Sequence, residues 1–299
     1  MPLDTDDFLD IDDVTPAELD ALLDRAAEMK AGEVDPRLTD RTLGMIFEKP
    51  STRTRVSFET GMTRLGGHAM FLGPDDIQLG HGEPLRDTAR VLGRYVDGVM
   101  ARLFDHEDVE VLAAHADCPV INGLTDEAHP CQTLADLLTI HEAVGEDAHV
   151  AWVGDGNNVG QSFVVGAAMA GIEVSVATPA GYGMDPDVLD RAAEFGADIE
   201  PTTDPEAAID GADVVYTDVW ISMGQEDQRA EKLSAFEGFQ VNADLLAGTD
   251  ADVMHCLPAH RGEEITDEVM ESDRALVWDQ AENRMHAQNA LLVELLGET

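Results

Sequence analysis

The polar run Ser51-Thr52-Arg53-Thr54-Arg55 brings hydroxyl and guanidinium groups together within a short stretch of chain. An apolar, strand-like run over 42–47 precedes it, and a helix-like segment over 56–65 follows it. At such a strand-to-helix junction, free backbone N–H groups and the helix dipole favour an anion. Guanidinium groups also bind phosphate oxygens through paired hydrogen bonds. The run therefore predicts a phosphate-binding site, and ordinary helix capping by Ser51 is the alternative interpretation.

A second polar junction, His129-Pro130-Cys131-Gln132, follows the strand-like run 119–123. Proline at a first helical position fixes the local turn, which places His129 at a helix N-terminus. The dipole there keeps the imidazole neutral, so that it can donate a hydrogen bond to a carbonyl oxygen. A histidine that only caps the helix would explain the same pattern.

The glycine-rich run GDGNNVG over 154–160 also lies between a strand-like and a helix-like segment. Its spacing, G-x-G-x-x-x-G, departs from the dinucleotide-binding fingerprint. The following strand, 174–177, ends without the acidic residue that would bind a ribose. Tight turning of the chain is the other explanation for these glycines.

Two more polar segments follow later strands. Asp218 begins the segment DVWISMG over 218–224 and is a candidate partner for an ammonium group, with an ordinary polar turn as the alternative. The segment HCLPAHRGEE over 255–264 ends another strand. Together with His129 and Cys131 it suggests a zinc site, but no pair of residues has the close spacing of metal ligands. We therefore expect no metal and no cofactor.

The composition is strongly acidic, with 61 Asp and Glu against 18 Lys and Arg and a formal charge of −43. A hydrophobic fraction of 44% excludes a disordered acidic chain. Mutual repulsion of these charges destabilises the folded state at low salt. At about 1 M salt the Debye length falls to roughly 3 Å, which screens the repulsion. The composition therefore indicates a halophilic protein, because an acidic tail for a partner would form one block.

The cysteines and the start of the chain bear on its location. None of Cys118, Cys131 and Cys256 belongs to a CxxC pair, which indicates a reducing compartment. The residues after Met1 do not form a basic and then apolar leader, and no apolar run reaches the roughly 20 residues of a membrane span. We expect a cytoplasmic protein without nucleic-acid or membrane partners.

Strand-like and helix-like segments alternate, which predicts an α/β fold with two domains, each a parallel sheet flanked by helices, joined by interdomain helices. We place the first domain at 1–135, the second at 136–280, and a C-terminal helix returning to the first domain at 281–299. The predicted strands are 42–47, 68–72, 96–103, 119–123, 150–153, 173–177, 213–217, 253–257 and 275–278. The predicted helices are 56–65, 84–95, 106–116, 131–144, 159–170, 187–195, 233–246 and 289–296.

The segments STRTR, HPCQ, DVWISMG and HCLPAHRGEE occur here in the order found in the aspartate/ornithine carbamoyltransferase family, which the chain resembles over essentially its whole length. The last three segments are similar to the ornithine branch of that family. The resemblance implies transfer of the carbamoyl group of carbamoyl phosphate to the δ-amine of L-ornithine, giving L-citrulline and phosphate. It also implies a homotrimer or a larger assembly of trimers.

For carbamoyl phosphate, the resemblance implies a set of residues from several segments. They are Ser51, Thr52, Arg53, Thr54, Gln78, Arg102, His129, Gln132, Cys256, Leu257 and Arg284. Arg102 and His129, with Thr54, would polarise the carbonyl group. Gln78 would reach into a neighbouring subunit's site, and Gly82 lies in the same loop where some members carry a basic residue.

For ornithine, the resemblance implies that Asn158 binds the carboxylate, while Asp218, Ser222 and the backbone of Met223 bind the α-amino end. Cys256, next to Asp218, would favour the uncharged δ-amine. The catalytic residues implied are Arg102, His129, Cys256 and Asp218.

Three other classes of protein share part of this pattern. A putrescine carbamoyltransferase would share STRTR and HPCQ, but DVWISMG favours a substrate with an α-ammonium group. A nicotinamide dehydrogenase would need the missing ribose acid. A non-catalytic regulatory subunit would have lost phosphate or carbonyl ligands, and this chain keeps them.

Overall fold

The computed structural model describes residues 3–32, 37–74, 82–145 and 147–297. The chain forms two compact units, one of Met1–Ala135 with Asn283–Thr299 and one of Asp136–Glu282. The divisions fall inside the helices α5 (Pro130–Ala143) and α11 (Val277–Leu296), so the chain passes from one unit to the other in helical conformation.

A four-stranded parallel sheet lies at the centre of the first unit, in the order β2-β1-β3-β4. Its inner strands, β1 and β3, are buried along almost their whole length, as is typical of parallel strands covered on both faces. The strands are β1 (Thr42–Phe47), β2 (His68–Leu72), β3 (Gly98–Arg102) and β4 (Val120–Leu124).

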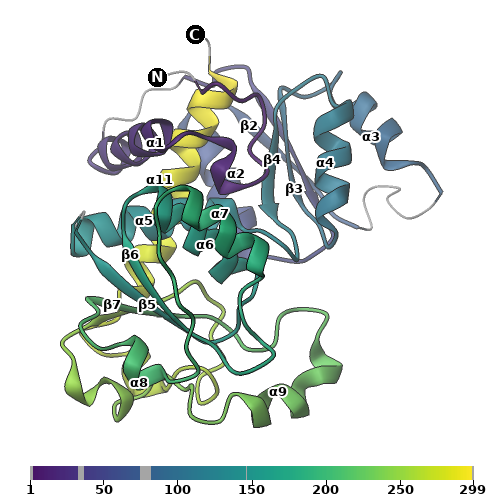
Figure 1. Ribbon diagram of the computed structural model, residues 1–299. Coiled ribbons are helices and arrows are strands. Elements are labelled where there is room, and N and C mark those ends of the chain that lie inside the picture. The colour runs from purple at the N-terminus through teal and green to yellow at the C-terminus, as the bar shows by residue number, and fades with distance from the viewer. Residues whose placement is uncertain (1–2, 33–36, 75–81, 146, 298–299) are drawn as a thin grey trace. The chain divides into compact units, whose positions relative to one another are not determined.

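Helices cover this sheet. Figure 1 shows α3 and α4 next to each other, and their residues Ala89, Val109 and Leu112 join strand residues in one apolar cluster. On α2, Gly61 permits a close approach of α11, because a Cβ atom at this position would lie 2.2 Å from Asn289 Oδ1. The helices of the unit, besides the parts of α5 and α11 that belong to it, are η1 (Ile11–Asp13), α1 (Pro16–Lys30), α2 (Thr52–Arg64), α3 (Leu85–Leu92) and α4 (His106–His115).

The second unit has its own four-stranded parallel sheet, in the order β6-β5-β7-β8. Its strands are β5 (His149–Val153), β6 (Glu173–Ala177), β7 (Val214–Thr217) and β8 (Asp252–His255). Strand residues such as Val153 and Val215 pack with Trp220, Phe236 and Phe239 in one buried cluster. The helices are α6 (Asn158–Met169), α7 (Pro186–Glu194), α8 (Pro205–Ala208), η2 (Glu226–Gln228), α9 (Arg229–Ala235), η3 (Leu245–Gly248) and α10 (Asp267–Met270).

The predicted fold class, two parallel sheets flanked by helices, is confirmed. Two predicted elements are wrong. The run 275–278 forms only an isolated bridge between Ala275 and Val253, because α11 begins at Val277. The predicted helix 233–246 ends early, since Gly238 adopts a φ of 95° that an α-helix does not allow. Helix α1 lies outside the predicted helices, although Thr15 and Glu18 form a capping box at its start.

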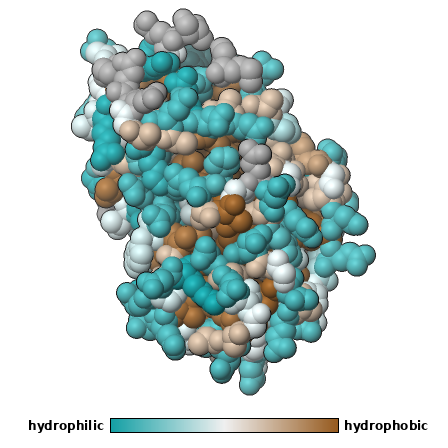
Figure 2. All heavy atoms as spheres, turned by 90° about the vertical axis from the view of Figure 1, so that its left-hand side faces the viewer, coloured by the Kyte–Doolittle hydropathy of each residue, from teal (hydrophilic) through white to brown (hydrophobic). Residues whose placement is uncertain are grey.

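Hydrophilic side chains cover most of the face shown in Figure 2, with apolar side chains visible among them. Such a surface is expected where 61 acidic residues must remain hydrated around two apolar cores. Within the described ranges, no helix has both the length and the apolar character needed to cross a bilayer.

Candidate active site

The polar residues of the first unit gather at the carboxyl ends of its parallel strands. β1 ends at Phe47, four residues before Ser51, and β3 ends at Arg102, which pairs in register with Phe47. The backbone N–H groups of Glu48 and Lys49 donate to the Arg102 carbonyl oxygen at 2.9 and 3.5 Å. Ligand sites in open α/β sheets form at this edge, where neighbouring strands deliver their last residues.

Helix α2 begins immediately after Ser51, whose side chain accepts a hydrogen bond from the backbone N–H of Thr54 at 3.2 Å. Ser51 therefore caps the helix, as the alternative interpretation predicted. The other N–H groups of the first turn form the positive end of the helix dipole and still favour an anion. Thr52 is exposed, Arg53 is half-buried and Thr54 is buried. Arg55 is engaged elsewhere, because its Nε lies 2.9 Å from Glu59 and its guanidinium stacks on the Phe71 ring at 3.9 Å.

Arg284, from α11, lies at the centre of a buried hydrogen-bond network in the first unit. Its Nη1 donates to Gln132 Oε1 at 2.7 Å and its Nη2 donates to Thr54 Oγ1 at 3.3 Å. Gln288, with its amide oriented to satisfy both ends, accepts from Arg284 and donates to Ser57 Oγ at 2.6 Å. The structure therefore brings together three of the predicted residues from helices far apart in sequence.

His129 is buried immediately before α5, with 4% of its surface exposed. Burial holds the pKa of this imidazole well below its ordinary value of 6.5, and the nearby cations Arg284, Arg102, Arg53 and Lys49 lower it further. His129 is therefore a neutral imidazole surrounded by positive charge. A neutral imidazole can donate one N–H hydrogen bond, and the surrounding cations attract an anion.

Lys49 is a member of this cationic group that the sequence motifs did not indicate. It is buried, its Nζ pairs with Asp126, and the same Nζ lies 4.4 Å from the centre of the Phe104 ring. Its signal in the sequence is rarity, since the chain contains only three lysines and Lys49 directly precedes the Pro50-Ser51 turn.

The pKa of His129 predicts an acid-sensitive stability. Below pH 6.5 the unfolded chain binds a proton at this imidazole and the folded chain does not, so stability decreases as the pH falls. One such group contributes a slope of up to about 1.4 kcal/mol per pH unit to the free energy of unfolding. Urea unfolding in concentrated KCl between pH 5 and 6.5 should therefore show a steeper slope for the wild type than for His129→Asn.

The matched control for this measurement is His68→Asn, at an exposed position of β2. This variant should keep the wild-type slope. Identical slopes for the wild type and His129→Asn would contradict a neutral, buried imidazole.

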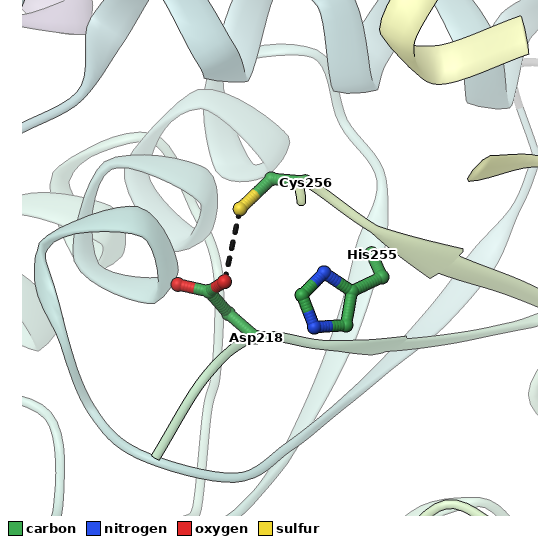
Figure 3. Close-up of side chains that lie close together, drawn as sticks. All are labelled: Asp218, His255 and Cys256. Carbon is green, nitrogen blue, oxygen red and sulfur yellow. Dashed lines mark hydrogen bonds between the residues drawn. The ribbon is translucent and has the colours of Figure 1, made fainter. Parts of the chain in front are cut away.

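In the second unit, Asp218 and Cys256 meet at the carboxyl ends of β7 and β8 (Figure 3). The Cys256 Sγ–H donates to Asp218 Oδ1 at 3.0 Å, and Asn157 Nδ2 donates to Asp218 Oδ2 at 2.8 Å. Asp218 is 5% exposed, so a cation placed beside this carboxylate would be largely removed from water. The arrangement is suited to an ammonium group.

His255 supports the neighbouring segment through both of its ring nitrogens. Nδ1 accepts from the Leu257 backbone N–H at 2.9 Å, so Nε2 carries the hydrogen and donates to Glu264 Oε1 at 3.1 Å. The same Glu264 oxygen accepts from the His260 N–H at 2.5 Å. These bonds hold Leu257 at a φ of 62°, a conformation that side-chain-bearing residues rarely adopt.

Two clusters of potential metal ligands occur in the part of the chain that the structure describes, Asp218 with His255 and Cys256, and His260 with Glu263 and Glu264. In the first, a metal would have to displace a hydrogen bond of His255. Cys131, the other cysteine considered for zinc, donates to the Asn122 carbonyl oxygen, and burial raises the pKa of its thiol to about 12. A thiol with this pKa is a poor metal ligand at neutral pH.

The glycines of the 154–160 run are explained by close packing of the chain on itself. A Cβ atom at Gly156 would lie 2.4 Å from the backbone of Gly183, and one at Gly160 would lie 2.7 Å from the Trp152 ring. Asn157 caps α6 by accepting from the N–H groups of Val159 and Gly160. Close packing accounts for Gly156 and Gly160, and the turn after β5 accounts for Gly154, which has a φ of 149°.

The other predicted site residues are distributed as follows. Asn158 is buried in the first turn of α6, whereas Ser222 is half-buried and Met223 is exposed in the segment after β7. Gln78 lies outside the described residues. Gly82 has a φ of 98°, a conformation that suits glycine.

Comparison with known proteins identifies the family of each part of the chain. A family model described as aspartate/ornithine carbamoyltransferase, carbamoyl-P binding domain, matches residues 6–142, and the Asp/Orn binding domain model of that family matches residues 146–295. The ornithine carbamoyltransferase of Haloquadratum walsbyi is 70% identical over 293 residues, covering 97% of this chain and 98% of that protein. The ornithine carbamoyltransferase of Pyrococcus abyssi is 52% identical over 303 residues, covering 97% and 96%.

Solved structures are similar as well. The ornithine carbamoyltransferase from Pyrococcus furiosus has a TM-score of 0.93 and 51% identity, covering 98% of this chain and 97% of that chain. The enzyme from Thermus thermophilus has a TM-score of 0.90 and 47% identity, covering 98% and 99%.

The first unit carries cationic side chains around a buried imidazole, and the second carries a buried carboxylate beside a thiol. The relatives and solved structures place the chain among the group-transfer enzymes. The chain belongs to the aspartate/ornithine carbamoyltransferase family, as its motifs predicted.

Proposed function

We propose that this chain transfers the carbamoyl group of carbamoyl phosphate to the δ-amine of L-ornithine, giving L-citrulline and phosphate. The observation that carries the proposal is the buried, neutral His129 within a group of four cationic side chains, in the unit that matches the carbamoyl-P binding model. Positive charge of this kind binds a phosphate, and a neutral imidazole donates to a carbonyl oxygen.

The reaction needs no nucleophile from the protein. The neutral δ-amine attacks the carbonyl carbon, the carbonyl oxygen gains negative charge, and the C–O bond to phosphate then breaks. The departing phosphate accepts the proton that the amine loses. Arg102, His129 and Thr54 donate hydrogen bonds to the oxygen where negative charge develops, and each donor of this type contributes on the order of 3 kcal/mol.

In the first unit, Ser51, Thr52, Arg53 and Thr54 bind the phosphate group. Arg284 orients Gln132, whose amide contacts the carbamoyl amino group; the 2.7 Å bond between these two side chains supports this role.

In the second unit, Asp218 and Ser222 bind the α-ammonium group of ornithine with the backbone of Met223, and Asn158 binds its carboxylate. Cys256 lies 3.0 Å from Asp218 Oδ1, and with Asp218 it favours the uncharged form of the δ-amine. The backbone at Cys256 and Leu257 contacts the carbamoyl amino group, and the bond from Leu257 N–H to His255 fixes this segment.

A citrulline assay tests this assignment. The protein in several molar KCl should form the carbamoylated product from carbamoyl phosphate with ornithine, and much more slowly with putrescine or aspartate. A preference for putrescine would indicate a diamine carbamoyltransferase, and turnover of aspartate alone would place the chain in the other branch of the family.

We also propose that the chain acts in the cytoplasm as a trimer or a multiple of trimers, in which Gln78 enters a neighbouring subunit's site. The family resemblance supports the assembly, and the absence of CxxC cysteine pairs supports a reducing compartment.

Salt should control both stability and assembly of this protein. A charge of −43 over 299 residues repels itself within each chain and between subunits, and only high ionic strength screens it. Transfer from several molar KCl to dilute buffer should lower the melting temperature, dissociate the oligomer and abolish activity. Melting curves and sedimentation profiles that are the same in both buffers would contradict the halophilic interpretation and leave the catalytic assignment intact.

A further inference from the structure

Lys232 on α9 is a buried lysine that the proposed reaction does not use. Only 3% of its surface is exposed, and its Nζ lies 2.6 Å from Asp155 Oδ2 and 2.8 Å from Gln225 Oε1. The same ammonium group lies 5.5 Å from the centre of the Tyr182 ring. A lysine in such a position loses its hydration and depends on these partners for compensation.

The two hydrogen-bond partners of Lys232 belong to two different segments of the proposed ornithine site. Asp155 lies in the turn between β5 and α6, two residues before Asn157, which donates to Asp218 at 2.8 Å. Gln225 lies in the turn after β7, and its backbone N–H donates to the Ser222 carbonyl oxygen at 3.1 Å. One ammonium group therefore connects the turn that holds Asp218 to the turn that carries Ser222.

The surroundings of this connection are well packed. Trp220 and Phe236 lie on either side of the 222–235 segment in sequence, and their rings contact each other at a centroid distance of 5.1 Å. The Asp155 carbonyl oxygen accepts from Trp152 Nε1 at 3.0 Å. The ends of the segment and the 155 turn are thus fixed by the core, while the turn at 222–225 is more exposed and depends on polar links.

Stability alone does not explain a buried ion pair at this position. Replacing such a pair with apolar side chains of similar volume is often neutral or stabilising, so a buried pair is weak evidence for a purely structural role. Burial raises the pKa of Asp155, and the hydrogen bond from Lys232 opposes that change. This chain has only three lysines, and Lys232 is one of the two that are buried.

We propose that Lys232 is a positioning residue for ornithine: by bridging Asp155 and Gln225, it sets the 222–225 turn against the residues that hold Asp218. This inference rests on the proposed function, because it assigns the turn to ornithine binding. It concerns only the second substrate, so carbamoyl phosphate binding should be independent of Lys232.

Steady-state kinetics of the full-length protein in concentrated KCl can test the role. Lys232→Met keeps the length of the side chain and removes the ammonium group. It should raise the KM for ornithine at least about tenfold and change the KM for carbamoyl phosphate less than twofold, because only the ornithine turn is released. Lys232→Arg should restore most of the affinity, since the guanidinium can still reach both oxygens.

Two further variants keep the test informative if Lys232→Met does not fold. Gln225→Ala removes one end of the bridge at a half-buried position and should raise the ornithine KM in the same direction. Arg94→Met is the charge-matched control, because its side chain is 74% exposed in the first unit, and it should leave both KM values unchanged. Hydrogen–deuterium exchange of residues 222–235 gives a readout without catalysis, and Lys232→Met should accelerate it.

The possible outcomes separate this proposal from the proposed function. Wild-type protein that forms no citrulline would reject the function, whereas the exchange result would still report on the bridge. Equal rises in both KM values for Lys232→Met, or no rescue by arginine, would make Lys232 a structural residue. An unchanged ornithine KM together with unchanged exchange would overturn the positioning role.

Discussion

Asp218→Asn should reduce kcat/KM for ornithine more than about a hundredfold while carbamoyl phosphate still binds. Asp218 is 5% exposed, so its loss would leave the substrate ammonium group without a counterion in a poorly hydrated place. Removing one partner of a buried ion pair costs roughly 3–5 kcal/mol, and every 1.4 kcal/mol is a factor of about ten. Calorimetric titration with each substrate, together with citrulline kinetics, measures the two effects separately.

The control for this change is Asp190→Asn, which removes the same charge from an exposed position on α7. It should leave the kinetics within about twofold of the wild type, because exposed charges contribute little. Asparagine preserves the shape of Asp218, and its carbonyl oxygen can still accept from Asn157 or Cys256. Equal weakening of both substrates by Asp218→Asn would show that Asp218 serves the fold and not ornithine.

Arg53→Ala should weaken carbamoyl phosphate binding at least about tenfold and leave ornithine-side contacts in place. The guanidinium is half-buried at the start of α2 and contributes to the positive charge around His129. Loss of a charge-assisted hydrogen bond costs about 1.5–3 kcal/mol, which corresponds to a factor of roughly ten to 150 in affinity. Isothermal calorimetry with carbamoyl phosphate in concentrated KCl provides the dissociation constant.

Arg55→Ala is a closely matched control, since it removes the same group two residues further along the same helix. Arg55 is paired with Glu59 and stacked on Phe71, so its removal should change the carbamoyl phosphate affinity less than threefold. If Arg53→Ala saturated with carbamoyl phosphate like the wild type, the phosphate assignment would have to be abandoned.

Strands of the parallel sheets could be predicted because each is a short run rich in apolar and β-branched residues; this run is continuous in buried strands such as β3 and interrupted in the more exposed β2 and β6. β1, β2 and β6 have the predicted bounds. The predictions for 233–246 and 275–278 were wrong because of the backbone conformation. Each run contains apolar residues that suit the predicted element, but Gly238 and the start of α11 at Val277 decide the backbone conformation. Periodicity does not report such boundaries.

The three lysines show how far composition alone can point to residues with specific interactions. In a chain that avoids lysine, each of the three has a specific interaction: Lys30 donates to Asn283 at 2.8 Å, Lys49 pairs with Asp126, and Lys232 pairs with Asp155. Rarity in the sequence draws attention to all three lysines, and burial in the structure distinguishes Lys49 and Lys232 from Lys30. Rarity does not identify the partners of Lys49 and Lys232, which lie 77 residues away in the chain in both cases.

Local sequence was sufficient for the alternation of strands and helices, the polar strand-to-helix junctions and the acidic surface, because these depend on neighbouring residues and on composition. Only the tertiary structure decided which residues each guanidinium group contacts. Arg55, adjacent to the motif, lies on Phe71, whereas Arg284, 230 residues from Thr54, donates to its hydroxyl. The physical reason is that side-chain direction follows from helix packing: Gly61 lets α11 approach α2 closely, and that approach carries Arg284 to Thr54.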